Sequence, residues 1–205
     1  MDCHTTLEQV IEQCQTKGIN CVAIADHGAI DGALKMKEIA PFAVIVAEEI
    51  LTTTGEIMGV FLKELVPSGL SMEESISLIK DQGGLLCVPH PFDIFRPTAL
   101  NQQAVEKIIK YIDIIEIFNA RSPLLRSSNK ARTFAEKNGF PGSAGSDAHA
   151  PSEIGTVHIE MHEFNGKEEF LRSLAGGKVC GRQASLFAHF NTTLDRIKDK
   201  LRGGR

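Results

Sequence analysis

The sequence predicts an α/β fold in which short buried strands alternate with helices along 205 residues. Apolar runs recur that are too short for helices and suited to buried strands. Between these runs, apolar residues recur at helical spacing, with capping residues and glycines at the ends. No linker or internal repeat divides the chain. We therefore expect a parallel sheet with crossover helices.

The first helix is predicted from Leu7, Val10, Ile11 and Cys14, which recur at helical spacing before Gly18. The later helices follow the same spacing, and one begins at a serine with the capping-box glutamate three residues on. The predicted later helices span residues 31–39, 71–82, 101–110, 127–138, 167–175 and 191–202.

The predicted strands are apolar runs bounded by turn residues. They span residues 21–26, 42–50, 56–62, 85–90, 113–119 and 156–161, and residues 142–149 are predicted to form a small-residue strand and a turn. Polar residues follow five of these runs, at the edge where parallel α/β sheets carry their active sites. These residues are Asp26-His27, Glu48-Glu49, His90, Glu116 with Asn119, and Asp147 with His149. Because strand residues alternate between faces, we expect Glu49 rather than Glu48 to point into this edge.

Composition excludes several classes of protein. Hydrophobic residues make up 42% of the chain and charged residues 23%, which is typical of a globular domain and not of a disordered or membrane protein. The longest uncharged apolar stretch, residues 41–47, is far below the ~20 residues that cross a bilayer. A net charge of −4 argues against an extended nucleic-acid surface, although a local phosphate site is compatible with it.

The five cysteines form no CxxC pair, so neither a zinc ribbon nor a thioredoxin-like site is predicted. The start of the chain has no apolar signal region, and reduced thiols then favour a cytoplasmic location. The oligomeric state stays open.

Histidines and carboxylates converging at one edge suit Mn, Zn or Fe, and several such ligands allow more than one ion. Paired metals favour hydrolysis of a phosphate ester by activated water. Four histidines lack a strand-end context and are interpreted as surface or packing residues: His4, His158, His162 and His189.

Five motifs occur in a fixed order along the chain. They are Ala25-Asp26-His27, Glu49-Ile50, Pro89-His90-Pro91, Glu116-Ile117-Phe118-Asn119 and Gly145-Ser146-Asp147-Ala148-His149. Together they resemble the PHP (polymerase and histidinol phosphatase) family of metal-dependent phosphoesterases, over roughly residues 1–160. The segment of about residues 150–190 is similar to the short extension that often follows such domains.

The resemblance implies a distorted (β/α)7 TIM-like barrel with up to three metal ions at its C-terminal rim. It implies a barrel over residues 1–150 and a C-terminal extension over 151–205 that packs on it. The family opens with a strand ending in His-x-His, which this chain lacks. We therefore expect a barrel without its first strand, through a misplaced start or a truncation.

The resemblance also implies a set of metal ligands, with Glu56 standing where many members carry a histidine. The implied ligands are Asp2, His27, Glu49, His90, Asp147 and His149. His149, His90 and Asp147 are the expected catalytic residues. Arg121 is either a phosphate-binding residue or an exposed loop arginine. Asn119 is either a substrate-binding or supporting residue, or a turn residue.

Three functions remain open at this point. The first is a metal-dependent phosphoesterase acting on a small phosphorylated metabolite, a nucleotide or an oligonucleotide end. The second is a catalytically impaired PHP-fold binding or regulatory module, favoured by the absent His-x-His motif and by Glu56. The third, a polymerase-attached proofreading nuclease, is disfavoured by the single-domain length and the acidic balance. Fold analogy does not fix the substrate.

Overall fold

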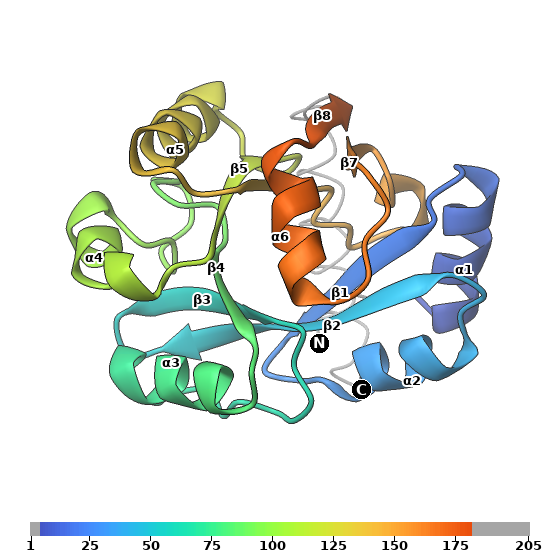
Figure 1. Cartoon of the computed structure of the whole chain (residues 1–205), viewed down its shortest axis with the longest axis horizontal. Helices are drawn as coiled ribbons and strands as arrows, with labels where there is room; N and C mark the ends of the chain where they lie inside the picture. The colour runs from blue at the N-terminus through green and yellow to red at the C-terminus, as the bar shows by residue number, and fades with distance from the viewer. Residues whose placement is uncertain (1–4, 182–205) are drawn as a thin grey trace, which may run out of the picture.

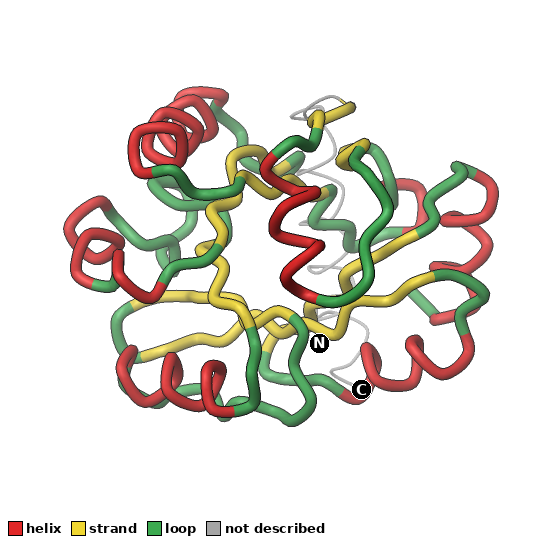
Figure 2. Tube along the Cα trace, viewed as in Figure 1, coloured by secondary structure: helices red, strands yellow, loops and turns green. Residues whose placement is uncertain are grey.

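The structure is a computed structural model that describes residues 5–181. Its main sheet has six strands in the order β1-β2-β3-β4-β5-β6, and a separate two-stranded sheet pairs β7 with β8. The strands of the main sheet are β1 (Cys21–His27), β2 (Ala43–Thr52), β3 (Gly55–Val60), β4 (Leu85–Val88), β5 (Ile114–Asn119) and β6 (Gly142–Gly145). The small sheet consists of β7 (Val157–Glu160) and β8 (Lys178–Gly181). The main sheet is curled, with one helix inside the arc of strands and the other helices outside it (Figure 2).

Six α-helices are described, and their boundaries agree closely with the apolar spacing. They are α1 (Leu7–Thr16), α2 (Asp31–Ile39), α3 (Met72–Asp81), α4 (Gln102–Lys107), α5 (Leu125–Asn138) and α6 (Lys167–Ala175). The capping box predicted for α3 is confirmed, since the Ser71 side chain accepts a hydrogen bond from the Glu74 backbone N–H. The predicted helix 191–202 lies outside the described residues.

The expectation of a parallel sheet is wrong at one strand. β3 runs antiparallel to both β2 and β4, whereas the other neighbouring pairs are parallel. Only Thr53 and Thr54 separate β2 from β3, and so short a connection permits only an antiparallel hairpin. The start of β3 therefore lies at the same edge as the ends of the parallel strands, and this hairpin brings Glu56 there.

The predicted strand and turn over residues 142–149 are confirmed. β6 ends at Gly145, and Asp147 has a φ of +48°, in the left-handed region. Asp147 and His149 therefore lie on a turn and not on an extended strand that would project both side chains to one side.

Helices cover both faces of the main sheet. One face packs against α2, α3, α4 and α5 through a large buried cluster that includes Val46, Ile57, Leu86 and Ile115. The alternate residues of the same strands pack against Phe170 and Leu174 of α6. Figure 1 shows α6 in the middle of the view, with α2, α3, α4 and α5 around the periphery.

The polar residues at the edge lie on the same face of their strands as the apolar residues that pack against α6. In β2, Ile45 and Ala47 contact the α6 cluster, and Glu49 follows two residues later. In β5, Ile114 does so, and Glu116 is the next residue on that face. The polar edge therefore continues the surface that α6 covers. None of the helices among residues 5–181 is both long enough and apolar enough to span a membrane.

Candidate metal centre

Four side chains from β1, β2, β3 and the residues after β4 converge at the polar edge. His27 Nδ1 lies 3.3 Å from Glu49 Oε2 and 3.1 Å from Glu56 Oε1. His90 Nε2 lies 3.3 Å from Glu56 Oε2 and 3.7 Å from Glu49 Oε1. One ligand atom from each of His27, Glu49 and Glu56 lies within 4.8 Å of the others. We call these four residues the imidazole half of the site.

Strand register explains why these residues meet. His27 pairs with Glu49 across the parallel β1–β2 ladder, and Leu51 pairs with Glu56 across the hairpin. Glu48, on the opposite face, accepts a hydrogen bond from the Val66 backbone N–H at 2.9 Å. Glu49 is therefore the member of the pair that faces the site.

In the imidazole half, the histidine rings stabilise the carboxylates, and the carboxylates stabilise the protonated form of His90. Burial favours the neutral form of Glu56, but the adjacent imidazoles of His27 and His90 outweigh it, so the pKa of Glu56 lies well below its usual value. Burial also favours neutral His90, yet the carboxylates of Glu49 and Glu56 raise its pKa to about 9. The two carboxylates thus create an environment that favours a cation.

His90 gives a direct test of whether these residues fit a metal ion. Its side chain is fully buried, and neither ring nitrogen makes a hydrogen bond to the described residues. A buried imidazole without hydrogen bonds is costly, and ligation of a metal would satisfy its lone pair. Two imidazoles and two carboxylates also form a donor set that suits Mn, Fe or Zn. These four residues therefore fit a divalent metal ion of the kind that the family resemblance implies.

A second group of side chains, from β5, the turn after β6 and the loop after β4, adjoins the first. Asn119 Nδ2 donates to Glu116 Oε1 and Oε2 at 3.3 and 3.2 Å and to Asp147 Oδ2 at 3.3 Å. The Arg96 guanidinium forms an ion pair with Asp147. Glu116 Oε2 accepts from the His90 backbone N–H at 2.6 Å, which joins the two groups. We call Glu116, Asn119, Asp147 and Arg96 the guanidinium half.

In the guanidinium half, unlike the imidazole half, burial dominates the titration of the central acid, and the cation is an arginine. Burial dominates at Glu116 and raises its pKa to about 7, against the lowering effects of His90 and Asn119. Burial lowers the pKa of Arg96, but Asp147, Glu116 and Glu49 raise it overall. Arg96 thus supplies the positive charge that these acids require.

Of the other predicted site residues, His149 adjoins the guanidinium half, and Arg121 pairs with a glutamate near it. His149 Nδ1 donates to the Asp147 carbonyl oxygen at 2.9 Å, so the His149 ring adjoins the guanidinium half. Arg121 pairs with Glu153 at 3.3 Å, and only 12% of its side chain is exposed. Glu153 Oε2 also accepts from the His149 backbone N–H at 2.8 Å. Asp2 lies outside the described residues.

Sequence reasoning did not find the residues contributed by the loop between β4 and α4. Arg96 reaches Asp147, and Thr98 Oγ1 donates to Glu56 Oε2 at 3.1 Å. Asp93, which is 3% exposed, accepts a hydrogen bond from Ser122 Oγ at 2.8 Å. The loop has no hydrophobic periodicity, and its only sequence signal is its position after Pro89-His90-Pro91.

A cavity of about 340 Å³ opens at the imidazole half. Its lining residues are His27, Gly28, Glu49, Leu51, Glu56, Ser68 and Thr98. This volume lies at the lower end of the range for small-molecule sites, about 300–1,000 Å³.

Comparisons of the sequence found one family match and two curated relatives. A family model described as PHP-associated matches residues 126–179. The uncharacterized protein MJ0417 of Methanocaldococcus jannaschii is 38% identical over 146 residues, which cover 70% of this chain and 58% of that protein. MJ1587 of the same organism is 39% identical over 115 residues, which cover 54% of this chain and 64% of that protein. The chain thus spans about three fifths of the length of these relatives.

Solved structures share the fold at low sequence identity. A two-domain protein from Bacteroides vulgatus, containing a predicted PHP-like metal-dependent phosphoesterase, has a TM-score of 0.67 at 13% identity, over 88% of this chain and 61% of that chain. A Bifidobacterium adolescentis protein whose name proposes a metal-dependent phosphoesterase has a TM-score of 0.61 at 14% identity, over 73% and 84%. An amidohydrolase from Chromobacterium violaceum with bound sulfate and no metal has a TM-score of 0.60 at 15% identity, over 88% and 93%.

Proposed function

We propose that this chain, whose residues 126–179 match the PHP-associated family model, is a member of the PHP family and hydrolyses a phosphate ester with the help of divalent metal ions. The observation that carries the proposal is the imidazole half, where three buried ligand side chains and the exposed His27 converge beside a cavity. The proposed substrate is a small phosphorylated metabolite, a nucleotide or an oligonucleotide end. We further propose a (β/α)7-type barrel over residues 1–150, an extension over 151–205 and a cytoplasmic location.

In the proposed mechanism, the residues that would hold a first metal ion, with Mn, Zn and Fe as the proposed identities, are His27, Glu49, Glu56 and His90. Asp147 and His149 would hold further metal, and Asp2 remains a proposed ligand. When bound, the ions supply Lewis-acid activation of water and of the phosphoryl oxygen.

The remaining steps belong to side chains of the chain itself. Arg96, which pairs with Asp147, would offer its planar guanidinium to the substrate phosphate. Asn119 orients the carboxylates of Glu116 and Asp147 through its Nδ2. His149 donates from Nδ1 to the Asp147 carbonyl oxygen, so in the neutral ring Nε2 carries the lone pair, which would ligate a metal ion or accept a proton from the attacking water. Arg121 is a proposed second phosphate contact, released when its pair with Glu153 opens.

The test is phosphate release after metal removal and restoration of Mn²⁺. Nucleoside monophosphates, nucleoside bisphosphates and short RNA serve as substrates. Asp147→Ala is expected to lose both bound metal and turnover, whereas Arg121→Ala is expected to keep its metal and weaken substrate binding only. Full metal content with near-normal turnover in Asp147→Ala would contradict the assigned site.

A second function, a PHP-fold binding or regulatory module without turnover, is favoured by one observation. Arg96 pairs with Asp147 and thereby neutralises a carboxylate that the catalytic proposal assigns to a metal. In that case the chain binds phosphorylated ligands without releasing phosphate. Binding of a nucleotide by calorimetry, together with no phosphate release at full metal content, would select this function.

A further inference from the structure

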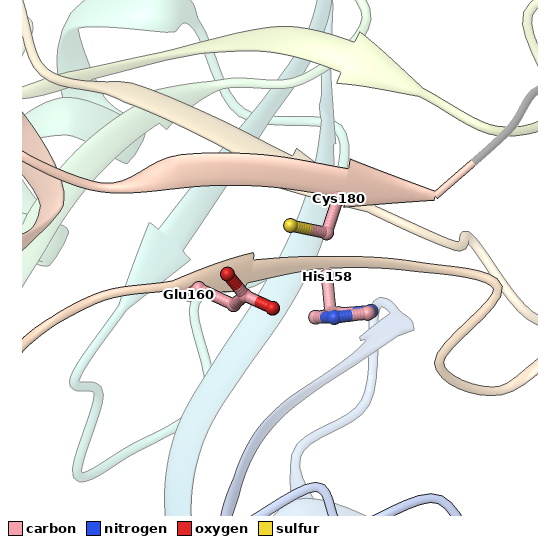
Figure 3. Close-up of side chains that lie close together, drawn as sticks. All are labelled: His158, Glu160 and Cys180. Carbon is pink, nitrogen blue, oxygen red and sulfur yellow. The ribbon is translucent and has the colours of Figure 1, made fainter.

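Three side chains with different ligand chemistries meet on the small sheet formed by β7 and β8. His158 and Glu160 belong to β7, and Cys180 belongs to β8. Figure 3 shows the three side chains gathered on one side of the paired strands. One ligand atom from each residue lies within 4.8 Å of the other two.

Strand geometry brings these residues together. His158 and Glu160 are two residues apart on β7, so their side chains face the same side of the strand. Cys180 is directly opposite His158 in the antiparallel register. Residues that face each other in this way have Cβ atoms about 4.5–5.5 Å apart. The backbone therefore fixes the cluster, and no long flexible loop has to form it.

The hydrogen bond of His158 prepares its ring as a ligand. A backbone carbonyl can only accept, so His158 Nδ1 donates to the Gly155 oxygen at 3.3 Å. The lone pair then lies on Nε2. Histidines that bind metals generally donate their other ring N–H to a carbonyl or carboxylate, which fixes the tautomer and the ring orientation.

The other two ligands are also available to a cation. Cys180 is a half-buried free thiol. Glu160 has a Lys178 Nζ neighbour at 3.9 Å, but their side chains are 63% and 78% exposed. An exposed ion pair of this kind contributes little to stability, so it does not hold Glu160 away from a metal ion.

We propose that His158, Glu160 and Cys180 form a second metal site, selective for Zn²⁺ and distinct from the phosphoesterase centre. Nitrogen, oxygen and thiolate sulfur are all zinc ligands, and three protein ligands leave a fourth position for water. Binding releases the Cys180 thiol proton to solvent as the zinc–sulfur bond forms. The ion links β7 to β8 across the connection that contains α6, and α6 covers the inner face of the main sheet.

Cobalt substitution in the full chain tests this site, because thiolate-to-cobalt charge transfer marks a sulfur ligand. We expect the amplitude of this absorption to correspond to one thiolate-bound Co²⁺ per chain. The absorption should disappear in Cys180→Ser. His158→Gln is expected to weaken Co²⁺ binding at least tenfold, as loss of an imidazole ligand requires. Cys21→Ser, at another half-buried thiol, is the matched control and keeps the absorption.

Two further measurements keep this site apart from the phosphoesterase proposal. The Glu49→Gln/Glu56→Gln double variant is expected to keep the cobalt–thiolate absorption while it loses any phosphatase activity. In the unmodified chain, stoichiometric Zn²⁺ is expected to slow alkylation of Cys180 at least tenfold, measured by peptide mass spectrometry. An absorption that Cys180→Ser leaves intact, or alkylation of Cys180 that Zn²⁺ does not slow, would overturn the proposal.

Discussion

The two halves of the strand-end site contain similar acids but balance their charges in different ways. In the imidazole half, Glu49 and Glu56 face the rings of His27 and His90. In the guanidinium half, Glu116 and Asp147 face the amide of Asn119 and the cation of Arg96. An imidazole can give up its proton and bind a metal, whereas an arginine keeps its charge and can only compete with one.

We infer from this difference that the two halves of the site differ in how readily they bind a metal ion. Under the proposed assignment, the imidazole half would receive a divalent cation without displacing an arginine or lysine side chain. The guanidinium half already contains a cation, so metal binding there requires Arg96 to leave Asp147. We therefore expect the two halves to respond differently to substitution, pH and added metal.

The largest effect is expected from Glu56→Gln, which removes a charged oxygen from the centre of the imidazole half. Metal content should fall, and turnover should fall about 100-fold or more, as for loss of a group that supports a metal. Elemental analysis and phosphate release measure the two effects. Glu48→Gln is the matched control, because Glu48 is fully buried on the opposite face and bonds to Val66. Equal losses in both variants would show a general structural effect.

A pH dependence is expected from the guanidinium half of the metal-free protein. The pKa of Glu116 is raised from 4.5 to about 7 in the folded state, so folding favours its protonated form. Stability from this group is present below pH 4.5 and is lost as the pH rises to about 7. The loss should approach about 3 kcal/mol in the free energy of unfolding.

Glu116→Gln isolates this contribution, since the amide does not titrate. Urea unfolding with a chelator present, measured at several pH values, should give a flatter profile between pH 4.5 and 7 in the variant. Identical pH slopes in the two proteins would show that Glu116 does not carry the raised pKa.

Arg96→Met sharpens the comparison by removing the cation of the guanidinium half. Asp147 and Glu116 then lack a compensating charge, and Mn²⁺ should bind there about tenfold more tightly. Titration calorimetry would measure this added binding. Arg121→Met provides the control, because Arg121 pairs with Glu153 and not with Asp147. If Arg96→Met binds Mn²⁺ no better than the unmodified protein, Arg96 does not compete with metal.

The smallest effect is expected from Asn119→Ala. The substitution removes the Nδ2 hydrogen bonds to Glu116 and Asp147 and should lower the free energy of unfolding by about 1 kcal/mol. Denaturant unfolding of the metal-free protein measures the change. Asn138→Ala is the comparison, because its Nδ2 bonds only to an exposed helix carbonyl, that of Phe134. A loss no larger than that control would argue against a positioning role for Asn119.

Much of the strand-end geometry could be predicted from the sequence because strands have a period of two. The apolar run before Glu48 and Glu49 predicts that the two acids face opposite sides, and the structure places Glu49 at the site and Glu48 beside Val66. The ligand role of Glu49 remains a prediction. The capping box at Ser71 and the end of α5 at Gly139 also followed from local chemistry and are confirmed.

Contacts made by irregular segments could not be predicted in this way. Arg96 and Thr98 belong to a loop whose course depends on distant backbone bonds, from Phe92 N–H to the Leu100 oxygen and from Glu56 N–H to the Thr98 oxygen. A loop residue has no fixed face, so nothing local indicates which side chain it will meet. The pairing of Cys180 with His158 likewise depends on the register of two strands separated by α6.

The sequence by itself determined the alternation of strands and helices and the placement of acids and histidines after apolar strands, because periodicity and capping act over a few residues. Only the tertiary structure decided which of those acids face imidazoles and which face Arg96. It also decided that β3 runs antiparallel and carries Glu56 to the same edge. These outcomes depend on contacts between residues far apart in the chain, where the free energy of a charge is set by its neighbours and its burial.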